Sequence, residues 1–133
     1  MRIFISYRYT GETTDGLQNF FYPVRDALLK RGFAVYLSLD DLDTWGQNEL
    51  ALREKFVRTF QALTDSDCLL VITRTTDRSE GLLMEVGFAL GQHKPVVLMV
   101  QTDVQTYVRD VASLVVEFQD HSDLLNQLNA LVF

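Results

Sequence analysis

The chain has 133 residues, of which 47% are hydrophobic and 23% charged, so it is long enough for one domain with a buried core and too apolar for disorder to be its main state. Twelve Lys and Arg against 18 Asp and Glu give a net charge of −6, which argues against binding to a nucleic-acid polymer. The single Cys excludes an internal disulfide and a cysteine-based zinc site.

The apolar stretch at the N-terminus is far too short for a signal peptide or a membrane span. It has the length of a strand instead. We therefore expect a soluble, cytoplasmic protein that has no membrane partner.

Short apolar runs alternate along the chain with longer stretches of helical period. In chain order, strands are predicted over 2–7, 33–37, 68–73, 95–100 and 114–118, where β-branched, aromatic or continuously apolar residues gather. Helices are predicted between and after them, over 17–32, 50–63, 79–91 and 123–133, where apolar residues recur at spacings of three and four. Pro23 is expected to mark a start or a kink of the first helix, and Gly32 its end.

This alternation predicts an α/β fold. We expect a single flavodoxin-like, Rossmann-like domain over 1–133, with a five-stranded parallel sheet and helices on both faces. Ligands of such sheets bind beyond the carboxyl ends of the strands. The segments to search are those that follow the strands, namely 6–14, 38–47, 74–85 and 101–103.

A candidate anion site precedes the third helix. Ser79 and Gly81 stand at its N-terminus, where free backbone N–H groups and the helix dipole favour an anion. Arg8 follows the first strand, and its guanidinium suits phosphate. The plainer interpretations are that Ser79 is only an N-cap, Gly81 only a turn residue and Arg8 a surface cation.

Glu85 is the strongest catalytic candidate. It lies about one turn into this helix among apolar neighbours, near the ligand end of the sheet, where a carboxylate can act as nucleophile or acid–base group. Gly87 and Gly91 indicate that the helix packs closely against a neighbour. The plainer alternative is a solvated glutamate on a helix face.

Other polar residues give weaker indications. Asp67 precedes a strand, so the pattern by itself favours a structural cap or turn at the edge of the sheet opposite the ligand. Neither His93 nor His121 accompanies further metal-type ligands, and phosphate-loop and dinucleotide fingerprints are absent. We expect neither a metal nor a cofactor.

Three segments resemble the nucleoside 2-deoxyribosyltransferase family, nearest its 2′-deoxynucleoside 5′-monophosphate N-hydrolase branch. They are SEGLLMEVGFALGQHKP (79–95), IFISYRYTG (3–11) and DCLLVIT (67–73). The resemblance implies cleavage of the N-glycosidic bond of a small-molecule deoxynucleotide or deoxynucleoside, through a covalent glycosyl intermediate on Glu85 that water or a second base resolves.

The same resemblance assigns further roles. It gives Ser6 and Arg8 contacts to phosphate or base, and it places Asp67 in the active site, against the structural interpretation of that residue. It also implies that Ser113 reaches the phosphate site of a neighbouring subunit. Which base leaves, and whether a 5′-phosphate is required, stay open.

A second resemblance gives a different function. FISYR (4–8) before an α/β pattern is similar to Toll/interleukin-receptor domains, which are protein-interaction modules or NAD-cleaving enzymes. Those domains usually carry a Trp shortly before the Glu, where this chain has Leu83 and Met84. A third alternative is a non-catalytic nucleotide-binding domain in which Glu85 is structural.

Consecutive aromatic residues indicate self-association. Phe20, Phe21 and Tyr22 cannot all face one core from a helix, so at least one should lie on an outer face. A loop that carries Leu42 and Trp45 is a candidate to cover it. Exposed aromatics mark interfaces. Together with the family resemblance, this predicts a symmetric homodimer, or a tetramer of two dimers, with the cleft near the subunit boundary.

Overall fold

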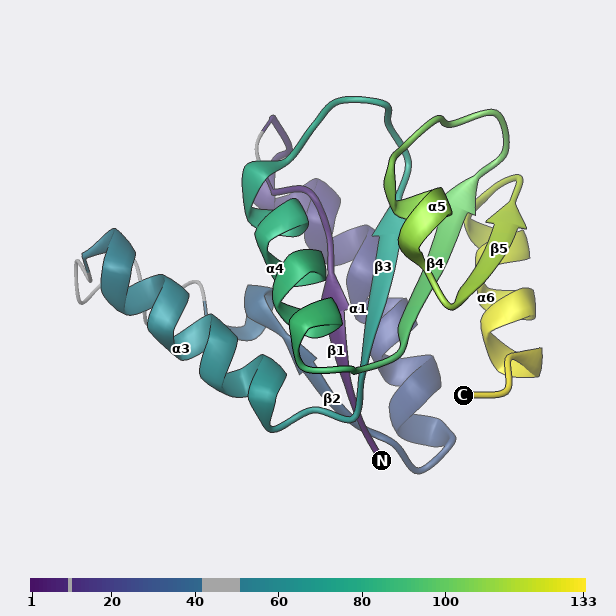
Figure 1. The fold of residues 1–133 in the computed structure, drawn as a ribbon. Helices are drawn as coiled ribbons and strands as arrows, with labels where there is room; N and C mark the ends of the chain where they lie inside the picture. The colour runs from purple at the N-terminus through teal and green to yellow at the C-terminus, as the bar shows by residue number, and fades with distance from the viewer. Residues whose placement is uncertain (10, 42–50) are drawn as a thin grey trace.

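The computed structural model describes residues 1–9, 11–41 and 51–133. Its five strands are β1 (Arg2–Ser6), β2 (Ala34–Leu37), β3 (Cys68–Thr73), β4 (Val96–Gln101) and β5 (Leu114–Phe118) (Figure 1). All neighbouring strands run parallel, in the order β2-β1-β3-β4-β5. This order is that of flavodoxin-like sheets and confirms the predicted α/β fold.

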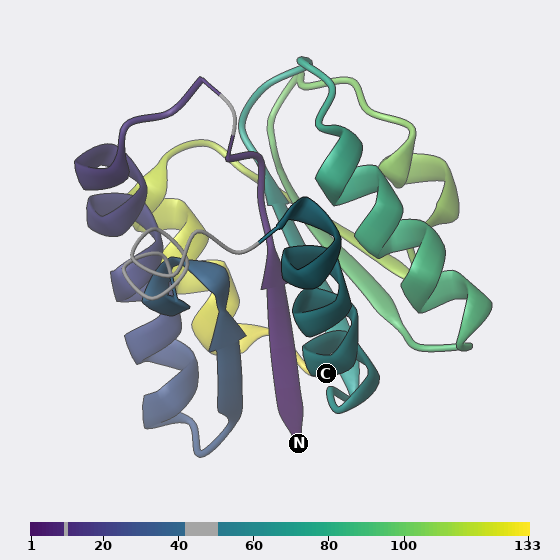
Figure 2. The ribbon, with the colours of Figure 1, turned by 90° about the vertical axis from the view of Figure 1, so that its left-hand side faces the viewer.

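Helices cover both faces of the sheet. They are α1 (Thr14–Lys30), α3 (Leu52–Thr64), α4 (Glu80–Gly91), α5 (Val108–Val111) and α6 (His121–Ala130), with a short 3₁₀ turn η1 (Ser38–Asp41) after β2. Viewed along the sheet, α1 and α6 lie on one side, whereas α3, α4 and α5 lie on the other (Figure 2).

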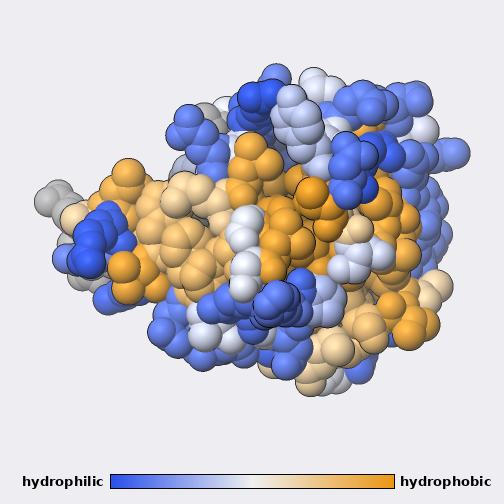
Figure 3. All heavy atoms as spheres, viewed as in Figure 1, coloured by the Kyte–Doolittle hydropathy of each residue, from blue (hydrophilic) through white to orange (hydrophobic). Residues whose placement is uncertain are grey.

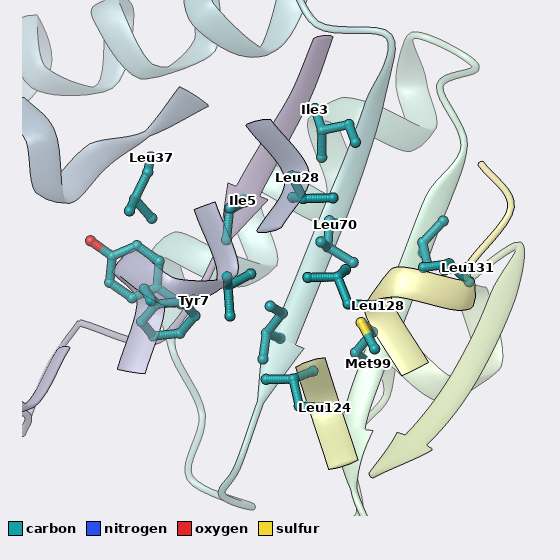
Figure 4. Packing of buried hydrophobic residues seen from close by; sticks show 14 of the residues in the cluster. Ile3, Ile5, Tyr7, Leu28, Leu37, Leu70, Met99, Leu124, Leu128 and Leu131 are labelled. Carbon is teal, nitrogen blue, oxygen red and sulfur yellow. The ribbon is translucent and has the colours of Figure 1, made fainter. Parts of the chain in front are cut away.

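Alternation along the strands divides the core in two. Ile3 and Ile5 pack with α1 and α6, while Phe4 between them packs with α3 and α4, because successive side chains of a strand point to opposite faces. All six residues of β3 are buried, as the central position of this strand requires. On the α1 side, Leu28, Leu124 and Leu128 close over Leu70 and Met99 (Figure 4).

Pro23 lies inside the first helix and does not begin it. Helix α1 runs without interruption from Thr14 to Lys30, although the ring removes one N–H from the hydrogen-bond ladder. Phe21 and Val24, on either side of Pro23, are both buried, so tertiary packing outweighs the lost bond. Gly32 ends the helix as predicted, with a φ of 88° that favours glycine.

The carboxyl ends of the five strands lie together at one edge of the sheet, the upper edge in Figure 1. The connections that leave this edge carry the residues considered below. Among the described helices, none combines the length and the apolar character that crossing a bilayer requires.

Candidate functional site

Two side chains from distant parts of the sequence meet at the carboxyl edge of the sheet. Ser6 is the last residue of β1 and is buried, and its hydroxyl donates a hydrogen bond of 2.8 Å to Oε2 of Glu85 on α4. The structure thus brings together two of the residues named from the sequence. This pair places a carboxylate where ligands of flavodoxin-like sheets bind.

Helix α4 turns Glu85 toward the sheet. Leu82, Val86 and Ala89 are buried against β3 and β4, and Glu85 adjoins this inward stripe. Side chains of a helix lean toward its N-terminus, so the carboxylate of Glu85 lies over the first turns of α4, near the carboxyl edge.

Burial controls the protonation of this carboxyl group. Loss of solvent raises the pKa of Glu85 to about 8, and the hydrogen bond from Ser6 lowers it in part. A group with such a pKa changes charge close to neutral pH. Titratable groups perturbed by desolvation at a ligand-binding edge are typical of catalytic sites.

Tyr7 lies beside this pair, although sequence analysis did not select it. Its hydroxyl is within 2.8 Å of the Ser38 hydroxyl, which begins η1. Burial raises the pKa of Tyr7, and the charge of Glu85 raises it further, while the hydrogen bond with Ser38 lowers it. The phenol is therefore neutral and close enough to Glu85 for the two groups to interact.

The N-terminus of α4 opens onto a cavity of about 400 Å³. Ser79 is the N-cap, and its Oγ accepts a hydrogen bond of 3.3 Å from the backbone N–H of Leu82. Gly81 lies one turn ahead of Glu85, and a Cβ there would meet no described atom within 4 Å, so this backbone is open to a ligand. The cavity walls come from the connections after β1, β3 and β4 and from α4 and α5: Arg8, Thr73, Thr75, Thr76, Asp77, Arg78, Ser79, Leu82, Leu83, Gln105, Thr106, Tyr107, Val108 and Asp110.

Arg8 lies at this cavity in an incompletely paired state. Its Nε is buried without a hydrogen-bond partner among the described residues, and its Nη2 is 3.8 Å from Oδ2 of Asp77. The Asp77 side chain is 68% exposed, so it is free to turn away, while that of Arg8 is only 21% exposed. Gly11, with a φ of 83°, lets the chain pass close to this guanidinium, since a Cβ there would come within 3.3 Å of it.

Two of the predicted site residues lie at the opposite edge of the sheet. Asp67 precedes β3, and its Oδ2 accepts a hydrogen bond of 2.6 Å from the backbone N–H of Arg2. Ser113 precedes β5, and its Oγ accepts a hydrogen bond of 3.1 Å from the backbone N–H of Val96. The structure therefore does not bring either residue to Glu85 within one chain, and Asp67 has the structural position that its pattern predicted.

Within the described chain, Gly87 and Gly91 do not pack closely against another element. Both glycines are exposed, and a Cβ at either would meet no described atom within 4 Å. The close packing of α4 instead involves its other face, through Val86 and Ala89.

Within the described part of the chain, no three His, Cys, Asp or Glu side chains gather as metal ligands would. The groups available to a substrate are the Glu85 carboxylate and, at the cavity, hydroxyls, two guanidinium groups and the carboxylates of Asp77 and Asp110. Of these, the guanidinium groups and hydroxyls suit an anionic ligand.

The fold is a parallel flavodoxin-like sheet, and a desolvated carboxylate lies where such sheets bind their ligands. These features define an α/β protein with a carboxylate site, and comparison with known proteins identifies its family. The family model described as nucleoside 2-deoxyribosyltransferase matches residues 14–127. The chain belongs to this family, which confirms the first resemblance over the Toll/interleukin-receptor alternative. It is accordingly an enzyme of the N-glycosidase and deoxyribosyltransferase kind.

Solved structures share the fold at low sequence identity. A CMP N-glycosidase, BcmB, from Clostridium botulinum superimposes with a TM-score of 0.72 and 13% identity, over 98% of this chain and 100% of that one. A conserved protein from Enterococcus faecalis gives 0.65 and 15%, over 98% of each chain. A 2-deoxyribosyltransferase from Bacillus psychrosaccharolyticus gives 0.63 and 19%, over 95% and 91%. No curated protein sequence matches the chain.

Sequence reasoning missed several residues of the site. Tyr7, Ser38 and Arg78 lie within the segments after the strands that the fold singled out, but their residue types carried no specific pattern. Tyr107 lies four residues beyond the last of those segments. Only the spatial closeness of the connections after β3 and β4 shows that it belongs to the cavity.

Proposed function

We propose that the protein cleaves the N-glycosidic bond of a 2′-deoxynucleotide or 2′-deoxynucleoside, with Glu85 as the nucleophile. The observation that carries this proposal is the hydrogen-bonded, desolvated carboxylate of Glu85 beside Ser6 at the ligand edge of the sheet. A carboxylate in this position matches the chemistry that the family performs on its substrates.

The reaction divides into two displacements at the anomeric carbon. In the first, Glu85 attacks this carbon as the bond to the base breaks, and the base leaves with the electron pair and takes up a proton from water. In the second, water attacks the same carbon, the carboxylate leaves, and the water releases a proton. A second base in place of water gives deoxyribosyl transfer.

The hydrogen bond from Ser6 has a definite part in this scheme. It stabilises the ionised form of Glu85 against the loss of solvent, and it fixes the orientation of the attacking oxygen. Tyr7, held by Ser38, lines the same corner of the site without contributing a second charge.

The 5′ side of the substrate fits the N-terminus of α4. Glu85 is six positions after Ser79, or about 9 Å along the helix axis, and the lean of the Glu85 side chain shortens this distance to the scale of a sugar phosphate. A phosphate at Ser79 and Gly81 would face the positive end of the helix dipole, with Arg8 as its charged ligand. This arrangement favours a 5′-monophosphate.

Release of free base tests the proposal. The protein is incubated with the common 2′-deoxynucleoside 5′-monophosphates, their nucleosides, their ribonucleotide counterparts and NAD, with and without a second free base, and the products are separated by chromatography. We expect free base from at least one 2′-deoxy substrate, and a new nucleoside or nucleotide if transfer occurs. If no 2′-deoxy substrate reacts, or only NAD releases its base, the proposal is overturned.

A further inference from the structure

The cavity holds a second arginine that the proposed reaction does not yet use. Arg78 lies in the connection between β3 and α4, one residue before the N-cap Ser79. Its Nη2 donates a hydrogen bond of 2.9 Å to the Tyr107 hydroxyl, and its guanidinium carbon is 5.0 Å from the centre of the Tyr107 ring. Both residues line the cavity.

This contact joins two separate connections across the cavity. Arg78 follows β3 and Tyr107 follows β4, so their contact links two connections that line the cavity. Tyr107 is 64% exposed, and its ring and hydroxyl both contact the Arg78 guanidinium. The ring and the hydroxyl together hold a guanidinium that solvent would otherwise leave mobile.

We propose that Arg78 is a second ligand for the phosphate group of the substrate, and that Tyr107 is the residue that positions it. Arg8 approaches the cavity from the connection after β1, and Arg78 from the connection after β3, so a phosphate at Ser79 is held between two guanidinium groups. The identity of the phosphate as that of a nucleotide rests on the proposed function. The binding of a phosphate group does not.

The formal charges of the side chains that line the cavity cancel, so an entering phosphate must displace a carboxylate. Arg8 and Arg78 are accompanied by two carboxylates, Asp77 and Asp110. Asp77 is the loose partner of Arg8 and is largely exposed, so an entering phosphate can displace it. Once Asp77 turns to solvent, the two guanidinium groups face the phosphate, and charge-assisted bonds of this kind are the strong ones.

The experiment measures binding of inorganic phosphate by titration calorimetry at fixed ionic strength. The proteins are the wild type, Arg78→Ala, Arg78→Lys, Tyr107→Phe, Arg8→Ala and the control Arg58→Ala, which removes an exposed charge from α3. Thermal melts check that each variant is folded. For the variants that turn over, kcat/KM for a 2′-deoxynucleoside 5′-monophosphate is compared with that for its nucleoside.

We expect Arg78→Ala and Arg8→Ala each to weaken phosphate binding at least tenfold, and Arg78→Lys to retain part of the affinity because it keeps the charge without the planar fork. Tyr107→Phe keeps the ring and loses only the hydrogen bond, so a loss of two- to fivefold is expected. Arg58→Ala should bind as the wild type does. The preference for monophosphate over nucleoside should fall in parallel.

Several outcomes would overturn this proposal. They are a wild type that does not bind phosphate at millimolar concentration, an Arg78→Ala variant that binds it as the wild type does, and an Arg58→Ala variant that loses as much. If only the proposed function fails, the result is distinguishable from these outcomes. No base is then released from any substrate, but phosphate binding still depends on Arg78.

Discussion

Glu85 must be ionised to attack, yet burial raises its pKa to about 8. Below this pH only a fraction of the enzyme carries the nucleophilic form, and this fraction falls tenfold for each pH unit. We therefore expect kcat/KM to rise with pH and to level off above about pH 8. Initial rates of base release at low substrate concentration, between pH 5 and 10, measure this profile, and a flat profile between pH 5 and 8 would contradict it.

The hydrogen bond from Ser6 should appear in the same profile. Ser6→Ala removes the group that lowers the pKa of Glu85, so the rising limb should move to higher pH. Ser122→Ala, which removes an exposed hydroxyl on α6, is the matched control and should leave the limb in place. An unchanged limb in Ser6→Ala would remove Ser6 from the site.

Stability should depend on pH through the same carboxyl group. Its pKa is raised in the folded protein, so the folded state disfavours ionisation, and a stability cost grows from the unfolded pKa near 4.5 up to about 8. Glu85→Gln removes this cost, which is at most about 5 kcal/mol. Melting temperatures should show little difference at pH 4 and a more stable variant at pH 9. A constant difference across this range would show that Glu85 is not desolvated.

At the scale of the element, the N-terminus of α4 stabilises the helix through its N-cap and is also the proposed phosphate site. One substitution at Ser79 changes phosphate binding without removing the N-cap. Ser79→Asp keeps an N-cap acceptor for the N–H of Leu82, so the melting temperature should stay close to that of the wild type. The added charge repels a phosphate, so monophosphate binding should fall at least tenfold. Ser79→Ala should instead lose about 1 kcal/mol of stability. Equal phosphate binding by Ser79→Asp and the wild type would place the phosphate elsewhere.

The elements themselves could be predicted because local patterns determine them. Continuous apolar runs such as 68–73 identify central strands, and Gly32 identifies a helix end. Glu85, Ser79 and Arg8 could be named because they follow strands in this fold. The contact between Arg78 and Tyr107 could not be predicted, since it joins two connections whose closeness depends on the order of β3 and β4 in the sheet.

Lys94 belongs to the segment that resembles the family, but its contacts are structural. Its Nζ donates hydrogen bonds to the carbonyl of Thr64, the last residue of α3, and to the carbonyl of Ser66 just after it. A cation there satisfies carbonyls that the helix leaves free. Lys94 is the penultimate residue of the segment 79–95 that resembles the family, and it has a structural role at the edge of the sheet opposite Glu85. The sequence alone does not show at which of these two edges a residue lies.

At the scale of the whole molecule, the surface that favours self-association lies on α4 and not on α1. Phe21 is buried, while Phe20 and Tyr22 are half-buried beneath the guanidinium groups of Arg74 and Arg25, at 4.0 and 4.2 Å from the ring centres. These aromatics are therefore largely covered within the chain. The loop residues Leu42 and Trp45, invoked to cover them, lie outside the described residues.

Helix α4 exposes an apolar stripe instead. Its outward residues are Leu83, Met84, Gly87, Leu90 and Gly91. Figure 3 shows the apolar surface continuing from α4 toward α3 and toward β5. A helix that is apolar on both faces is normally buried on both, and a stripe with small residues permits two copies to approach closely about a twofold axis. Leu83 also lines the cavity, so this packing would place the cavity near the subunit boundary.

Light scattering tests the homodimer. The wild type should have a mass near 2 × 15.3 kDa, or a multiple of this value, and Leu90→Glu should shift it toward 15.3 kDa. Leu29→Glu is the control, since Leu29 is 48% exposed on α1, away from the stripe, against 40% for Leu90. A wild-type mass of 15.3 kDa at micromolar concentration would contradict the dimer and any role for Ser113 in a neighbouring site.

The rate of base release by Glu85→Gln tests the central claim most directly. The substitution keeps the size of the side chain and removes its charge, and Glu54→Gln, on the exposed surface of α3, provides the matched control. We expect Glu54→Gln to release base within about twofold of the wild-type rate, and Glu85→Gln to lose about four decades or more, because a neutral amide cannot attack the sugar as a carboxylate does. A folded Glu85→Gln variant that keeps more than about a hundredth of the wild-type rate would show that Glu85 does not attack the sugar.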